Sequence, residues 1–184
     1  MQLSLILILS ANLLFSIDIA KAAYQMRPGL WETSFTIKSE DGKMENGMNR
    51  MQAEIDKMPA DQRKMMEQMM AKNNVRMSGN ATIAKVCISK EQAKNMEIPL
   101  KDNKNCTHQV VKRTPNSVKV KFACSGEVTT KGEGEFSLNS PTSYKGNTIV
   151  DSISHGKSER IDLNQKGKWL SAECGNVYAV ESKK

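Results

Sequence analysis

Alternation of apolar and polar residues between Ser117 and Leu138 is the feature that most limits the fold of this chain. In SVKVKFAC, lysines separate the apolar side chains, and in EVTTKGEGEFSL, charged residues occupy most of the alternate positions. Successive side chains of a β-strand point to opposite faces, so this period of two predicts antiparallel strands with one polar face. The buried parity holds Val118, Val120, Phe122, Cys124, Val128, Thr130, Gly132, Gly134, Phe136 and Leu138.

Short strands recur along most of the chain after residue 30. The candidates are 30–38, 81–88, 107–113, 143–153, 159–164 and 169–174. Turn-forming residues separate them at 114–117, 125–127, 139–143, 154–158 and 165–168. This pattern predicts a mainly β fold with a helical insertion, in which about seven to eight strands form a curved antiparallel sheet or an incomplete barrel.

The segment MPADQRKMMEQMMAKNN, from Met58 to Asn74, instead follows a helical period. At about 100° per residue its methionines fall on one stripe, and most of its charged residues lie outside that stripe. The methionines are Met58, Met65, Met66, Met69 and Met70. Pro59 suits a first helical turn, and the upstream segment NRMQAEIDK is expected to form a second short helix. We therefore predict a helical insertion near 48–74, whose methionine-rich amphipathic helix packs on the sheet.

Two interpretations of the methionine stripe remain open. Thioether sulfur is a soft ligand, and residues four apart on a helix can converge on one copper(I) ion. The candidate ligands are Met65, Met66, Met69 and Met70. The other interpretation is apolar packing, because methionine is flexible and fills gaps against an irregular surface. The stripe matches the period that burial alone requires, so we expect no metal and keep copper(I) binding as the alternative function.

Gly132 and Gly134 fall at the buried parity of their strand, where a side chain is expected. A glycine at such a position marks either a sharp bend of the sheet or a place where something else approaches the backbone. We favour the bend. A small cavity for an apolar ligand is the alternative, and it would support a carrier function.

The chain has four cysteines, an even number, which indicates disulfides in a protein that leaves the reducing cytosol. Their spacings lack the close pairs typical of a zinc site. Three pairings are possible in principle. Since Cys124 and Cys174 each share a parity with apolar neighbours, we predict that these two pair in the core. Cys87 and Cys106 would then close the loop between them.

Residues 1–22 are typical of a secretory signal, with an apolar run from Leu3 to Ile19 and an A-x-A cleavage pattern at 20–22. An uncleaved anchor is the alternative, because the start carries no basic residue. The run is short for a membrane span and contains Asp18. We predict a single β-rich domain over 23–184, periplasmic or secreted, with no stable membrane span after cleavage.

The net charge of +7 comes largely from lysines scattered along the chain. They form no basic block interleaved with aromatic residues, so we expect no nucleic-acid partner. His108 and His155 lie outside any recognisable catalytic or metal motif, and no cofactor motif is present. We therefore expect a protein that is not an enzyme and that binds no cofactor.

Several motifs together resemble those of a bacterial family of small exported proteins catalogued as domain of unknown function 3617. They are RPGLWE (27–32), MPADQRKMMEQMM (58–70), VCISKEQ (86–92), CSG (124–126), GEGEF (132–136), SPTSYKG (140–146) and GKWLSAECG (167–175). The resemblance implies an exported, cysteine-paired, sheet-rich domain without an established activity. It transfers no catalytic residue to any position.

These observations favour a non-enzymatic binding module for a small apolar ligand or for a protein of the cell envelope. We expect the ligand at a seam between the methionine helix and the sheet. The candidate residues are Trp31, Met65, Met69, Gly132, Gly134 and Trp169.

Overall fold

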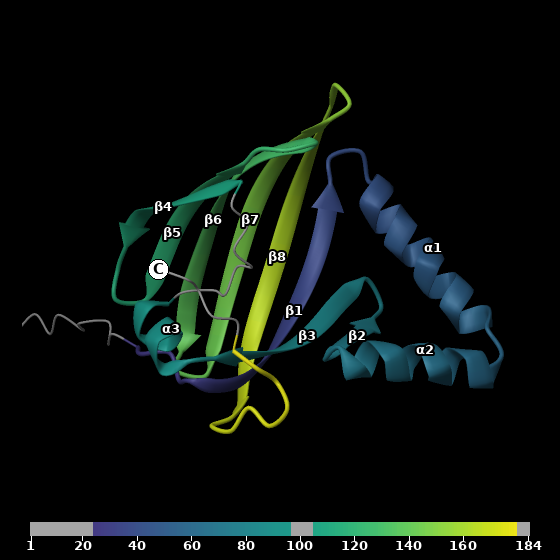
Figure 1. Cartoon of the computed structure of the whole chain (residues 1–184), viewed down its shortest axis with the longest axis horizontal. Coiled ribbons are helices and arrows are strands. Elements are labelled where there is room, and N and C mark those ends of the chain that lie inside the picture. Colours follow the sequence, from purple (N-terminus) through teal and green to yellow (C-terminus); the bar gives the residue numbers. More distant parts are fainter. Residues whose placement is uncertain (1–23, 97–104, 180–184) are drawn as a thin grey trace, which may run out of the picture.

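The computed structural model describes residues 24–96 and 105–179, in which eight strands form one antiparallel sheet (Figure 1). The strands are β1 (Gly29–Ser39), β2 (Val75–Ser78), β3 (Ala81–Ile88), β4 (Cys106–Arg113), β5 (Ser117–Cys124), β6 (Val128–Ser140), β7 (Ser143–Ser154) and β8 (Lys157–Ser171). The helices are α1 (Lys43–Lys57), α2 (Ala60–Lys72) and α3 (Lys90–Asn95). The predicted mainly β fold with a helical insertion is confirmed.

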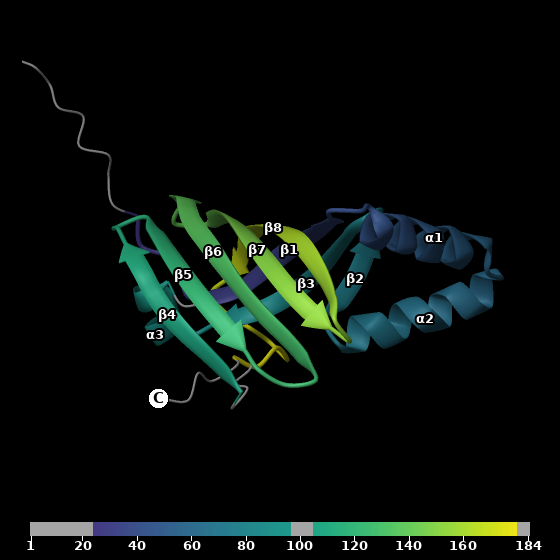
Figure 2. The same cartoon turned by 90° about the horizontal axis from the view of Figure 1, so that it is seen from above.

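The strand order is β2-β3-β1-β8-β7-β6-β5-β4. Strands β4 to β8 form a meander, and β1 joins it by pairing with β8 on one side and β3 on the other. The sheet curls without closing, so β2 and β4 are its edges (Figure 2). It is therefore a curved open sheet, the first of the two forms that the sequence predicts.

One expected turn is not a turn. Residues 165–168 lie inside β8, which runs unbroken where two strands, 159–164 and 169–174, are predicted. This segment pairs with β1 and with β7, and backbone pairing on both sides holds a glycine-containing sequence in extended form. Strand β2, which has four residues, is too short to be recognised from its own sequence.

The strand register separates a mostly apolar face from a polar one. Residues that are direct partners on neighbouring strands have side chains on the same face, as do alternate residues along one strand. The residues that share a face with Trp31 are assigned in this way. We call the face that carries Trp31 the concave face, because the sheet curls around the side on which α3 lies (Figure 2). The other, convex face carries most of the lysine, arginine and carboxylate side chains of the sheet.

The buried core lies at one end of the concave face, beneath α3. Its members are Trp31, Ile88, Ala93, Leu138 and Tyr144. Trp31 has no exposed surface, and its ring centroid lies 5.5 Å from that of Tyr144. Helix α3 begins with a capping box in which Ser89 and Gln92 bond each other's backbone N–H groups, which holds Ala93 against the core.

Helices α1 and α2 lie beyond the β1 side of the sheet and meet at an angle (Figure 1). Helix α1 contacts β1, and α2 contacts the edge strand β2. No residue of α2 is buried, and Met65 and Met69 are 64% and 56% exposed. The predicted packing of this helix on the sheet is found, at β2, but it covers the stripe only in part: Met58, Met66 and Met70 are half-buried, whereas Met65 and Met69 are exposed. The chain enters β2 directly after α2, which keeps this helix at the sheet edge instead of across a face.

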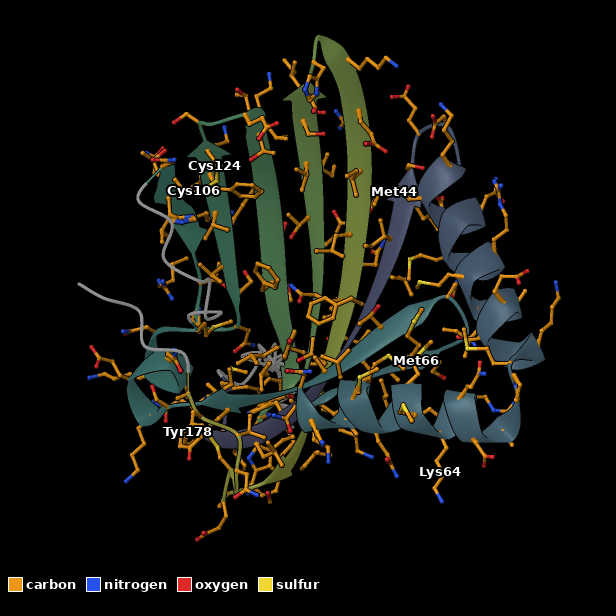
Figure 3. All side chains as sticks on the ribbon, turned by 45° about the vertical axis from the view of Figure 1, so that its right-hand side comes forward. Met44, Lys64, Met66, Cys106, Cys124 and Tyr178 are labelled. Atoms are coloured by element: carbon orange, nitrogen blue, oxygen red, sulfur yellow. A yellow bond between two sulfur atoms is a disulfide. The ribbon has the colours of Figure 1, made fainter. Side chains whose placement is uncertain are left out.

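The predicted cysteine pairing is also wrong. The disulfides join Cys87 to Cys174 and Cys106 to Cys124. Cys106 and Cys124 are directly opposite each other on β4 and β5 (Figure 3). Strands β6 and β7 separate β5 from β8, so Cys124 has no access to Cys174, which follows the end of β8.

In the described part of the chain, no helix is long and apolar enough to cross a bilayer. Segment 1–22, predicted to be a signal peptide, lies outside the described residues.

Candidate functional site

Three glycines of the concave face each lie beneath an aromatic ring from the neighbouring strand. Phe122 covers Gly132, Phe136 covers Gly146, and Tyr144 covers Gly167. In each pair the two residues are direct cross-strand partners. A Cβ atom added at any of the three glycines would lie at or within 2.5 Å of the ring. The rings therefore lie flat on the sheet backbone, a form of packing that only glycine permits.

These contacts decide between the two interpretations of Gly132 and Gly134. The space beside Gly132 is filled by the Phe122 ring, and a Cβ atom at Gly134 would lie 2.8 Å from the Thr148 hydroxyl. Close packing on a curved sheet explains both glycines. The space that a cavity at Gly132 would need is occupied.

Around the flat rings, the concave face carries apolar side chains that are only half-buried. They are Phe35, Ile37, Val120, Phe122, Phe136, Val150, Ile161 and Leu163. They come from β1, β8, β7, β6 and β5, which are five consecutive strands of the sheet. A contiguous, partly exposed apolar surface of this kind is typical of a face that contacts another apolar group.

A few polar side chains interrupt this apolar surface. The hydroxyls of Thr33 and Tyr144 are hydrogen-bonded at 2.9 Å across the sheet. Burial raises the pKa of the Tyr144 hydroxyl, and the bond with Thr33 acts in the opposite direction. Thr148 and Gln165 are buried on the same face, with 8% and 5% of their surface exposed.

The six predicted seam residues do not form one site, although Trp31 and Trp169 are direct partners on β1 and β8 and Gly132 and Gly134 are neighbours on one face of β6. Trp31 is in the core, where its indole N–H donates to the Arg27 carbonyl. Trp169 donates to the Pro28 carbonyl, and the Arg27 guanidinium lies over its ring. Met65 and Met69 lie on α2, which contacts the edge strand β2 and carries the labelled Met66 in Figure 3. A small hollow of about 130 Å³ lies between α2 and the sheet, and none of the six lines it.

A second candidate site is an open groove of about 640 Å³ on the convex face, over β4 to β8. Charged side chains line it, and two ion pairs lie among them: Lys121 with Glu133 at 3.6 Å, and Arg160 with Asp151 at 3.1 Å. A hydrogen bond from Lys119 lowers the pKa of the Glu133 carboxyl. Lys131 also lines the groove and has no ion-pair partner among the described residues, so the groove presents one unmatched positive charge beside the two pairs.

His108 borders this groove, yet its side chain belongs to the other face. It is the direct partner of Phe122, with ring centroids 6.5 Å apart, whereas Glu133 and Asp151 have the opposite parity. His155 lies in the β7–β8 turn, where its Nδ1 is 3.0 Å from the Ser154 hydroxyl. Among the described residues, neither histidine is hydrogen-bonded to or ion-paired with a carboxylate.

The sequence has detectable similarity to uncharacterised proteins. A sequence model of the family described as "Protein of unknown function (DUF3617)" matches residues 26–174. A protein of Pseudomonas putida, described as an uncharacterized protein in lpd-3 5'region, is 36% identical over 113 residues, which cover 58% of this chain and 78% of that protein. No solved structure matches the chain. The matched range includes all the strands of the sheet and both disulfides.

Proposed function

The chain belongs to the DUF3617 family of proteins of unknown function, as its motifs indicate, and from its geometry we propose that it is a non-enzymatic module that binds a small apolar ligand. The observation that carries the proposal is the half-buried apolar surface on the concave face, with aromatic rings lying flat over glycines. An extended apolar chain can lie along such a surface. Each CH₂ group moved out of water there contributes about 0.8 kcal/mol.

The placement of the histidines supports a binding role over catalysis, because neither has a carboxylate partner. The two disulfides agree with an oxidising compartment, and we propose the periplasm or the exterior of the cell. A protein of the cell envelope is the alternative occupant of the concave face. The probe experiment below distinguishes it from a small molecule.

We expect the neutral fluorophore N-phenyl-1-naphthylamine to bind the purified protein with a saturable rise in fluorescence. Val120→Lys, on the concave face of β5, should weaken this binding about tenfold. The bound apolar ligand would remove water from the new ammonium group, which is unfavourable for an unpaired charge. Fluorescence titration at fixed ionic strength measures both dissociation constants.

Ala123→Lys is the matched control. It lies on the same strand with the opposite parity, is exposed, and adds the same charge to the convex face. Equal weakening by the two variants would contradict a concave-face site. Absence of saturable binding to the unmodified protein would exclude a small apolar ligand of this kind and favour an envelope protein as the occupant.

Copper(I) binding is the second candidate, favoured by the exposure of Met65 and Met69, which are four residues apart on α2. A copper role predicts that the protein retains Cu(I) against a competing chelator. The predicted ligands are Met65, Met66, Met69 and Met70. Retention should disappear when all four are replaced by leucine. Equal retention by the leucine variant and the unmodified protein would rule this role out.

A further inference from the structure

The concave face contains a polar side chain that has no hydrogen-bond partner among the residues that the structure describes. Gln165 is 5% exposed, and its side-chain amide makes no hydrogen bond within the described residues. Burying an amide without a partner costs about 1–3 kcal/mol, so such a group in a native protein calls for an explanation.

The amide must reach the small accessible surface that remains. No fully buried polar side-chain atom in the described part of the chain lacks a partner, so the unpartnered atoms of Gln165 cannot be fully enclosed. Its position on the concave face is fixed by its direct partners, Phe35 on β1 and Gly146 on β7. Its Cγ lies 3.0 Å from where a Gly146 Cβ would be, beside the Phe136 ring that covers the same glycine. The amide is therefore exposed only toward the apolar surface.

Further donors lie next to it. Thr148, two residues beyond the Gln165 partner Gly146 on β7, is 8% exposed, and its hydroxyl has no bond to the described residues. The bond between Thr33 and Tyr144 uses one of their two hydroxyl hydrogens, which leaves one O–H to donate. The cluster thus keeps unused donors, namely the amide N–H groups of Gln165, the Thr148 hydroxyl and one hydroxyl of the Thr33–Tyr144 pair. A ligand group that accepts hydrogen bonds would satisfy it.

The absence of charged side chains among the cross-strand neighbours of Gln165 favours a neutral hydrogen-bond acceptor over an ionised one. The six cross-strand neighbours of Gln165 are Thr33, Phe35, Ile37, Tyr144, Gly146 and Thr148. None is charged, so a carboxylate placed here would lose its hydration without gaining a cation. A neutral carbonyl, as in an ester or amide, loses much less.

We propose that Gln165, with Thr148 and the Thr33–Tyr144 pair, binds the neutral carbonyl of an acyl-chain ligand whose apolar tail lies on the concave face. This inference rests on the proposed apolar-ligand function and names the chemical class of that ligand. The ring-on-glycine surface accommodates the tail, and the polar cluster sets the position of the head group along it.

The test compares methyl decanoate, decanoate and decane as competitors of N-phenyl-1-naphthylamine. For each competitor we compare the concentration that displaces half of the fluorophore, corrected for the competitor's partition coefficient between water and an apolar solvent. On this corrected scale we expect the ester to be the strongest competitor and decanoate the weakest. Gln165→Met, which keeps the length of the side chain and removes its amide, should weaken the ester about five- to tenfold and leave decane unchanged. Its resistance to urea should be equal or greater, because an unpartnered amide is removed.

Lys166→Met is the control, with the same new side chain on the same strand but on the convex face, and it should change neither ligand. Thr148→Val provides an independent variant, expected to act in the same direction as Gln165→Met. Equal effects of Gln165→Met on ester and decane would overturn the carbonyl site while leaving apolar binding in place. Failure of all three competitors and of the fluorophore to bind would overturn the proposed function itself.

Discussion

Replacing Cys87 and Cys174 together by alanine is expected to lower the free energy of unfolding by about 4.5 kcal/mol, because this disulfide closes a loop of 87 residues. Cys87 is in β3, and Cys174 follows β8, so the bond links the two strands that flank β1. Without it, the unfolded chain gains the entropy of a much longer open segment. Urea unfolding followed by tryptophan fluorescence measures the difference.

The matched comparison replaces Cys106 and Cys124 together by alanine. Their disulfide closes a loop of 18 residues, so its removal should lower the free energy of unfolding by about 3 kcal/mol. The smaller loop restricts the unfolded chain less. A larger loss from this second variant would contradict the expected ranking. Peptide mapping that found Cys124 joined to Cys174 would contradict the pairing itself.

Gly167→Ala is expected to destabilise the protein by about 3 kcal/mol, although a single methyl group is added. The new Cβ atom would overlap the Tyr144 ring carbons Cδ1, Cε1 and Cζ. The ring would have to leave its place beside Trp31 and give up its hydrogen bond to Thr33. Urea unfolding is again the measurement, with the fluorescence of Trp31 as a local reporter.

Two further variants separate this clash from a general effect of alanine. Gly47→Ala, in α1, has no atom within 4 Å and should stabilise by about 0.5–1 kcal/mol through helix propensity. In a Tyr144→Ala background, Gly167→Ala should cost little, because the obstructing ring is gone. An undiminished cost in that background would show that the ring is not the cause.

Several elements of the fold follow from local sequence. The alternation in 117–124 and 128–138 predicts which side chains share a face, and the register confirms each of them. The strand at 81–88 is found at its predicted bounds. These predictions succeed because the period of two is a property of the extended backbone itself and depends on no distant residue. The helical period of 58–70 likewise identifies α2.

The candidate site is only partly visible in the sequence. Gly132 and Gly134 stand out as glycines at a buried parity, whereas Gly146 and Gly167 gain their meaning only from the rings of Phe136 and Tyr144. Gln165 is placed in an expected turn when read from the sequence. It becomes a buried residue of the concave face because β1 and β7 pair with both sides of its strand.

By itself, the sequence determined most of the strands, the helical insertion and the residues that share each face, since these depend on spacing along the backbone, whereas β2, α3 and the unbroken course of β8 were not evident from it. Only the tertiary structure decided which elements are neighbours. The partner of Cys174 depends on the order of the strands, in which β6 and β7 separate β5 from β8. The exposure of Met65 and Met69 depends on the short connection from α2 to the edge strand β2. An apolar stripe shows that a face favours burial, whereas the path of the chain decides whether anything covers it.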